Sequence, residues 1–217
     1  AVPPSRLPPL WGAVLKVSLS PFGLTYSSTI TLLLLNRFLL IYGNEQSVAI
    51  YSCISYITAI IYLLLQGVGD GCQPLISLYY GEGKDADVRQ TRRTAYFTAF
   101  VISAVCAAVV FLTRTKIGLL FGASASANAG VGRYLPFFLA TVLLLSFVRI
   151  TTSYFYATEK AALSYLLVYA EPVCTLVFLL TLPLAFKLNG VWAAIPVAQV
   201  CAFVIALIAK CRVKRSV

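Results

Sequence analysis

Three ionisable side chains stand in or beside long apolar stretches of this 217-residue chain, where a charge needs a physical reason. Arg149 and Glu171 each interrupt an otherwise uncharged run, and Asp70 follows another run within a glycine-rich string. An ionisable group at the centre of a membrane costs about 2.5–3.5 kcal/mol on insertion scales, so such groups mark ion pathways, ligand sites or buried pairs. These three residues are our candidates for ion coupling or gating.

The spacing between Arg149 and Glu171 predicts that they lie at the same depth. Lys160 is the centre of the turn between their two runs, 11 residues after Arg149 and 11 residues before Glu171. At a rise of about 1.5 Å per residue, both stand roughly 16 Å from the turn of an antiparallel helical hairpin. We expect an interhelical ion pair, and the alternative is that each residue faces a separate wet cavity. Desolvation offsets much of the attraction in such a pair, so a structural role and a proton-coupling role for Glu171 both stay open.

The string GVGDGCQP at 67–74 holds three glycines and a proline, which favours a bend or a break in a helix. Asp70 stands 22 residues after Val48, roughly 33 Å along a straight helix and hence near one membrane surface. Two interpretations follow for Asp70: an acid in a vestibule at the interface, or a gating or ion-linked residue in a broken helix.

A second group of polar side chains could line a ligand cavity. Residues 17–36 are rich in Ser and Thr and contain Pro21, which predicts a kink. Hydroxyls in an apolar helix line wet cavities or pack at helix contacts, and Tyr rings bind organic cations or anchor a helix at the interface. The substrate-cavity candidates are Tyr26, Ser27, Thr31, Asn36, Gln73 and Tyr154.

Composition identifies the environment of these residues. Hydrophobic residues make up 60% of the chain and charged residues 11%, against about 25% charged in an ordinary soluble domain, and the mean hydropathy is +0.88. A soluble domain cannot hide that many apolar side chains, and disordered chains are polar and charged. The chain is therefore predicted to be an integral membrane protein.

The same composition excludes several functional classes. The formal net charge is +10, but the basic residues cluster at the ends of apolar runs, where lipid headgroups explain them without nucleic acid. The chain has no His, which excludes His-based metal sites, and its six Cys form no CxxC pair, which favours buried free thiols. With no nucleophile beside a base, no phosphate loop and no pair of carboxylates, we expect neither an enzyme nor a metal site.

Six apolar runs are each long enough to span a membrane as a helix, which needs about 20 residues. A transmembrane barrel would instead show alternating segments of about ten residues, so we predict an all-α bundle of six transmembrane helices. The six runs are 17–36, 46–69, 94–113, 134–157, 161–186 and 188–209. Between them, residues 81–93 are predicted to form a charged loop, and residues 113–133 an external segment with a short helical piece at 117–121.

Basic residues are unevenly divided between the two sides of this bundle. Eleven lie on the side of both termini: Arg6, Lys16, Lys84, Arg89, Arg92, Arg93, Lys160, Lys210, Arg212, Lys214 and Arg215. Five lie on the other side: Arg37, Arg114, Lys116, Arg133 and Lys187. Because cytoplasmic loops carry the excess of Lys and Arg, we expect both termini in the cytoplasm and a multi-pass protein of the cell membrane.

Four strings occur in the order and spacing of one transporter family. The string QPLISLYYGEGK at 73–84 resembles the QPLISYNYGAGK signature of the multidrug and toxic compound extrusion (MATE) family. YFYATEKA at 154–161 is similar to the family's YFQAxGKA, and LNGVWAAIP at 188–196 to its GLxGVWLAxP. LLFG at 119–122, followed by Tyr134 and Leu135, resembles the link between its ninth and tenth helices. The chain therefore resembles the C-terminal six-helix lobe of a MATE transporter.

This resemblance implies a function and a domain organisation. The family exports drugs and organic cations in exchange for H+ or Na+ by alternating access between two lobes, so the implied partners are a second six-helix lobe, the lipid bilayer and small organic cations. No cofactor is implied beyond a transported ion. We read residues 1–13 as a Pro-rich linker remnant, 14–210 as the bundle and 211–217 as a basic cytoplasmic tail. The absence of Met favours a fragment, a processed chain or a redesigned one.

Departures from the family pattern leave alternatives open. Sodium-coupled members carry acids in the equivalents of runs 17–36 and 134–157, whereas the first run here has no acid and the fourth has Arg149; Gln199 stands where members often have an acid. The alternative function is a bundle, engineered or a remnant, that assembles without transporting. A flippase lobe for lipid-linked sugars is disfavoured because Arg149 is the only deep cation for a pyrophosphate.

Overall fold

The computed structural model describes residues 29–215, and they fold as helices throughout. The described part of the first helix is Thr29–Tyr42. It is followed by α2 (Glu45–Gly81), α3 (Asp85–Thr113), the short α4 (Ile117–Leu120), α5 (Ala125–Ala157) and α6 (Ala161–Arg215). The all-helical fold class is confirmed, as is a short helix at 117–120. The predicted linker at 1–13 and the predicted kink at Pro21 lie outside the described residues.

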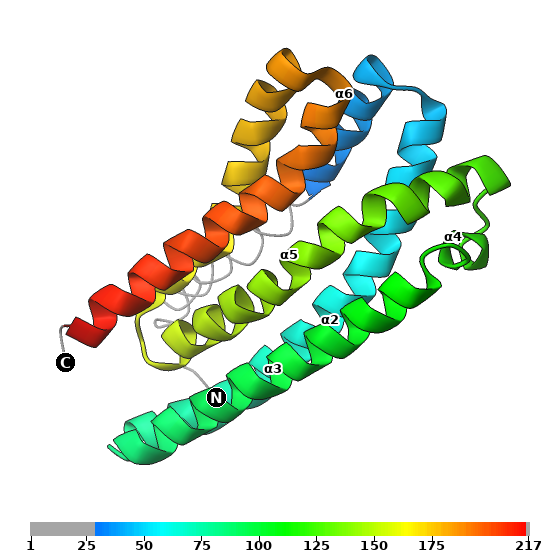
Figure 1. The fold of residues 1–217 in the computed structure, drawn as a ribbon. Helices are drawn as coiled ribbons and strands as arrows, with labels where there is room; N and C mark the ends of the chain where they lie inside the picture. The colour runs from blue at the N-terminus through cyan, green and yellow to red at the C-terminus, as the bar shows by residue number, and fades with distance from the viewer. Residues whose placement is uncertain (1–28, 216–217) are drawn as a thin grey trace, which may run out of the picture.

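The long element α6 is two helices joined at a sharp reversal. Lys187 has φ 49° and ψ −129°, which interrupts the helical backbone between residues 186 and 188, and Figure 1 shows the second half running back beside the first. A Cβ on Gly190 would lie 2.5 Å from the carbonyl carbon of Leu182, so only glycine permits this close return. The fifth and sixth predicted helices therefore meet at Lys187, the residue that separates the predicted runs 161–186 and 188–209.

Two segments predicted as connections are largely helical. The helix α3 begins at Asp85, so most of the charged stretch 81–93 forms its first turns. Asp85 and Asp87 stabilise this end of the helix, because the N-terminus of a helix carries a partial positive charge. The helix α5 begins at Ala125, where the Ser124 side chain accepts a hydrogen bond from the Ala127 amide at 3.2 Å. Both α3 and α5 therefore begin before the predicted apolar runs, in charged or small residues that we had predicted to form connections.

The predicted break near Asp70 is wrong, because α2 continues as a helix from Glu45 to Gly81 with Pro74 inside it. A Cβ on Gly69 would lie 2.6 Å from the Ser153 hydroxyl oxygen, whereas one on Gly67 or Gly71 would meet nothing within 4 Å. Gly69 thus serves a close approach between α2 and α5, and these glycines do not interrupt the helix.

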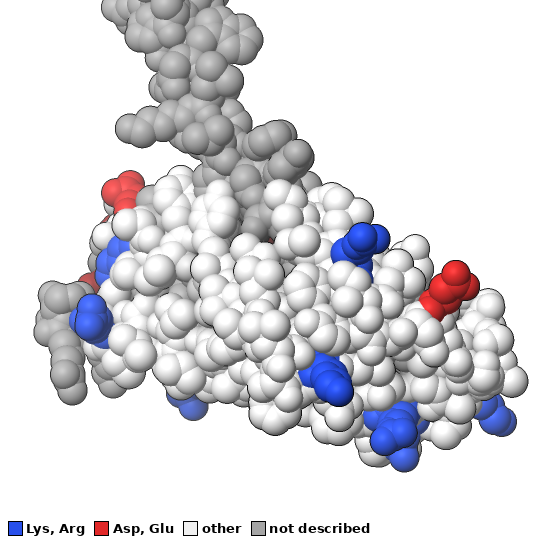
Figure 2. All heavy atoms as spheres, turned by 90° about the horizontal axis from the view of Figure 1, so that it is seen from above, with Lys and Arg blue, Asp and Glu red and all other residues white. Residues whose placement is uncertain are grey.

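The helices are arranged around α5, which packs against α2, α3, α4 and α6. The turns at 82–84 and 158–160 and the end of α6 lie at one end of the bundle, and α4 and the reversal at Lys187 lie at the other (Figure 1). Among the described residues, α2, α3, α5 and most of α6 are long and apolar enough to cross a membrane. Figure 2 shows a face on which uncharged side chains predominate, and large apolar side chains such as Leu63, Phe97 and Leu112 are exposed. Such a surface fits the acyl chains of a bilayer.

Candidate functional site

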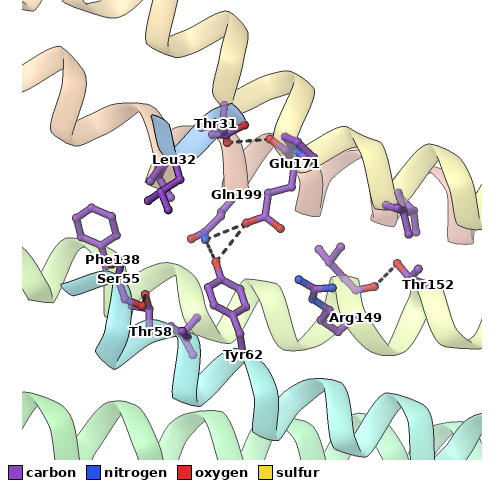
Figure 3. A pocket seen from close by; sticks show the side chains of 18 of the residues that line it. Thr31, Leu32, Ser55, Thr58, Tyr62, Phe138, Arg149, Thr152, Glu171 and Gln199 are labelled. Carbon is purple, nitrogen blue, oxygen red and sulfur yellow. Dashed lines mark hydrogen bonds between the residues drawn. The ribbon is translucent and has the colours of Figure 1, made fainter. Parts of the chain in front are cut away.

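A cavity of about 360 Å³ lies between the first described helix, α2, α5 and both halves of α6. Its volume is within the range of small-molecule sites. Apolar side chains, a few hydroxyls and two opposite charges form its wall (Figure 3). The lining residues are Thr31, Leu32, Tyr51, Ser55, Thr58, Ala59, Tyr62, Phe138, Val142, Val148, Arg149, Thr152, Leu167, Val168, Glu171, Pro172, Thr175, Ile195 and Gln199.

Glu171 projects into this cavity from the first half of α6 and accepts two hydrogen bonds on one oxygen. The Tyr62 hydroxyl of α2 donates to Oε1 at 3.2 Å, and the Gln199 amide of the second half of α6 donates to the same oxygen at 3.2 Å. The other carboxylate oxygen, Oε2, receives neither bond. Side chains from α2 and from the second half of α6 therefore orient this acid through one of its two oxygens.

Gln199 is the centre of this network and is 4% exposed. Its amide nitrogen also donates to the Tyr62 hydroxyl, and its Oε1 accepts a hydrogen bond from the Thr141 hydroxyl of α5. Donors and acceptors therefore follow one another in a fixed order from Thr141 through Gln199 to Tyr62 and Glu171. Hydrogen bonds that follow one another in this way restrain the orientation of each member of the network.

Arg149 lines the same cavity from α5, but the predicted ion pair with Glu171 is wrong. The salt bridge found among residues 29–215 joins Lys84 and Glu82, and Arg149 instead places its guanidinium carbon 5.7 Å from the centre of the Tyr62 ring. The helical rise correctly placed both charges at one cavity. The rotation of each helix about its axis, which chain spacing does not give, turned Glu171 toward the Tyr62 hydroxyl and the Gln199 amide, and Arg149 toward the Tyr62 ring (Figure 3).

The sequence analysis missed Tyr62, Ser55 and Thr58, which line the cavity from α2. These residues follow one another at intervals of three and four, so they form one polar stripe on an apolar helix, and that stripe was the available signal. The hydroxyls of Ser55 and Thr58 donate to Ser52 O at 2.8 Å and Ile54 O at 2.9 Å within their own helix. Their oxygens therefore face the cavity as acceptors.

The other predicted site residues are scattered. Thr31 lines the cavity, whereas Asp70 is exposed on α2, and neither it nor Gln73 is part of the cavity wall. Tyr154 packs under Arg92, 4.5 Å from its guanidinium carbon to the ring centre. Asn36 is off the cavity, and its buried Oδ1 has no hydrogen-bond partner among the described residues. Tyr26 and Ser27 lie outside the described residues.

Comparison with known sequences gives the family. The model of the family described as MatE matches residues 21–186. The chain is 25% identical over 191 residues to the multidrug export protein MepA of Staphylococcus haemolyticus, covering 88% of this chain and 42% of the relative. It is 27% identical over 197 residues to MepA of Staphylococcus saprophyticus, covering 90% and 43%. The chain thus spans less than half the length of the curated relatives it matches.

Comparison with solved structures gives the same fold. An outward-facing multidrug resistance MATE family transporter of the MOP superfamily superposes with a TM-score of 0.82 at 22% identity, over 93% of this chain and 46% of that one. A MOP superfamily transporter from Pyrococcus furiosus superposes with a TM-score of 0.81 at 22% identity, again over 93% and 46%. With its membrane-spanning helices and a family model that matches most of its length, this chain belongs to the MatE family and is a multi-pass membrane protein corresponding to one lobe of a MATE transporter.

Proposed function

We propose that this chain is one lobe of a secondary active transporter that exports drugs and organic cations from the cell in exchange for H+ or Na+. The two curated relatives are multidrug export proteins, and the chain has the fold of one half of such transporters. A second six-helix lobe, from another chain or from a second copy, is the proposed partner, and alternating access between the lobes is the proposed mechanism.

The observation that carries this proposal is the carboxylate of Glu171 in a cavity between apolar helices. A carboxylate in this position attracts a cation, and it can bind a proton in place of that cation. Exchange between the two at one oxygen would couple efflux to a proton gradient. The ionisable side chains that face it across the described cavity wall are Tyr51 and Tyr62 from α2 and Arg149 from α5.

Efflux from proteoliposomes tests the proposal. The protein is extracted gently and its native mass is measured against the 23.5 kDa of one copy, which shows whether a second lobe accompanies it. The resulting assembly is reconstituted, and ethidium efflux is recorded under a pH gradient, under a Na+ gradient and under neither. We expect gradient-driven efflux whose pH dependence is lost in Glu171→Gln.

Asp70→Asn is the matched control, because it removes an acid that lies on the exposed side of α2 and outside the cavity wall. We expect this variant to retain gradient-driven efflux. A wild-type assembly that binds its partner lobe but moves no ethidium under any gradient would support the alternative of a non-transporting bundle. Unchanged pH dependence in Glu171→Gln would remove the proton-coupling role from this residue.

A further inference from the structure

A second hollow, of about 210 Å³, is formed by α2, α3 and residues 117–121. Its residues on α2, among them Ile57 and Ile61, lie on the side of that helix turned away from Tyr62 and the first cavity. Eight hydrocarbon side chains and one thiol line it. We propose that this groove binds an acyl chain of an anionic phospholipid, whose phosphate is held by Arg114 and Lys116.

The groove has a buried floor and an open side. Ile57 and Ile61 are each 3% exposed, whereas Ile60, Val105 and Val109 along the rim are 54%, 57% and 55% exposed. Both α2 and α3 are long and apolar enough to cross a membrane. The open side of the groove therefore faces the hydrocarbon of the bilayer, and the ligand that reaches it there is an acyl chain.

The segment around α4 forms one end of the groove, where Ile117 and Phe121 line it. The Phe121 ring stacks on Tyr56 of α2, with ring centroids 6.3 Å apart and an interplanar angle of 4°. The Asn128 amide of α5 donates a hydrogen bond to the carbonyl of Thr115, and Figure 1 shows α4 next to the end of α3 and the start of α5. Contacts with α2 and α5 thus fix this segment, so the groove is formed without a ligand.

Two cations stand at the same end. Arg114 and Lys116 lie in the turn between α3 and α4, and residues 113–133 contain no Asp or Glu. The acid at the start of α2, Glu45, is 12 residues before Ile57, roughly 18 Å along the helix. Neither cation forms a salt bridge within the part of the chain that the structure describes. An anionic headgroup would supply the missing negative charge.

The separation between the cations and the groove matches the dimensions of a phospholipid. Val110 and Val105 come 4 and 9 residues before Arg114, roughly 6 and 14 Å along the helix, and one leaflet contributes about 15 Å of hydrocarbon. A phosphate at Arg114 therefore places its acyl chain beside these valines. The Arg114 guanidinium carbon lies 4.0 Å from the centre of the Phe111 ring and its Nη1 donates to the Phe111 carbonyl at 3.5 Å, which leaves its other N–H donors for a phosphate.

Photoreactive lipids test the preference for an anionic headgroup. The full chain is reconstituted in phosphatidylcholine nanodiscs with a trace of phosphatidylglycerol or phosphatidylcholine that carries a diazirine midway along one acyl chain. After illumination, mass spectrometry measures the lipid adducts on residues 57–61 and 105–110. The cations attract phosphatidylglycerol and repel the choline group, so we expect the phosphatidylglycerol probe to label these residues at least about fivefold more.

Charge substitutions assign this ratio to the two cations. In Arg114→Gln/Lys116→Gln the two probes should label the groove alike, because the groove itself is unchanged. The matched control is Arg89→Gln/Arg93→Gln, which removes the same charge from exposed side chains near the other end of α3. This control should keep the wild-type ratio.

A groove-filling substitution tests the position of the acyl chain. Val109→Trp places an indole on the rim above Ile57 and Ile61, so labelling of residues 57–61 should fall several-fold with both probes. Val101→Trp makes the same change at an exposed position of α3 outside the groove, and it should leave labelling unchanged.

Three outcomes would overturn the inference. The first is equal labelling by the two probes in the wild-type protein, and the second is a wild-type ratio in Arg114→Gln/Lys116→Gln. The third is a groove without adducts in a particle that holds two copies of the chain, because a second copy would then cover it. The measurements use no ion gradient and no substitution in the first cavity, so their result is independent of ethidium efflux.

Discussion

The Tyr62 hydroxyl donates a hydrogen bond to Oε1 of Glu171 at 3.2 Å, although the two residues are 109 positions apart in the chain. The bond joins α2 to the first half of α6 across the cavity, and the Gln199 amide from the second half of α6 bonds the same oxygen. Three helical segments therefore meet at one carboxylate, and the position of that carboxylate depends on all three.

Replacing Gln199 should destabilise the bundle more than replacing an exposed glutamine. Gln199→Leu removes the hydrogen bonds that Gln199 makes with Thr141, Tyr62 and Glu171, and a typical intramolecular hydrogen bond contributes about 0.5–1.5 kcal/mol to stability. Thermal unfolding of the detergent-solubilised protein, followed by circular dichroism, measures the loss. Gln66→Leu on the exposed side of α2 is the control. Equal melting temperatures for Gln199→Leu and wild type would show that the network contributes nothing to stability.

The return of α6 on itself should depend on Gly190. In Gly190→Ala the new methyl group meets the backbone of Leu182, which cannot rotate away as a side chain can, so we expect a loss of about 3 kcal/mol. Gly71→Ala is the matched control, because its methyl group would meet nothing within 4 Å and alanine favours a helix by about 1 kcal/mol. The two variants should thus shift the melting temperature in opposite directions, and a shift of the same sign in both would contradict this account.

Tyr96 should connect α3 to α5 and to the end of α6 by two separable interactions. Its hydroxyl and that of Thr151 are 2.8 Å apart in a hydrogen bond, and the Lys210 ammonium lies 4.0 Å from the centre of its ring. Tyr96→Phe removes the first interaction and should cost about 0.5–1.5 kcal/mol. Tyr96→Leu also removes the cation–π contact, which should add about 0.5–2 kcal/mol. Denaturation in detergent with increasing SDS compares the two variants, and identical midpoints would exclude a contribution from Lys210.

The side of the membrane on which each end of the bundle lies can be determined by thiol labelling. The positive-inside rule predicts that Cys211, which is exposed near the end of α6, faces the cytoplasm. With the other five cysteines replaced by alanine, a membrane-impermeant maleimide should label Cys211 only after the cells are permeabilised. A matched chain with alanine also at Cys211 and with Ser126→Cys, at the opposite end of the bundle, should be labelled in intact cells. The reverse pattern would invert the topology.

The apolar runs determined most of the fold. Six long apolar runs predicted six helices, because a helix bonds every backbone polar group within its own segment, as the interior of a membrane requires. The boundary at Lys187 and the short helix at 117–120 were predicted correctly from charges and composition. The first residues of α3 and α5 were not, although their last residues, Thr113 and Ala157, were, because outside the apolar runs no burial pattern separates a charged helical turn from a loop.

For the candidate site too, the sequence predicted one part and the tertiary structure decided the other. The sequence by itself placed Arg149 and Glu171 at one depth, because helical rise is a fixed length per residue. It could not say which way each side chain points, because that depends on the rotation of every helix against its neighbours. Only the tertiary structure brought Tyr62 and Gln199 to the carboxylate of Glu171 and set the Tyr62 ring against Arg149, and it placed Gln73 outside the cavity wall.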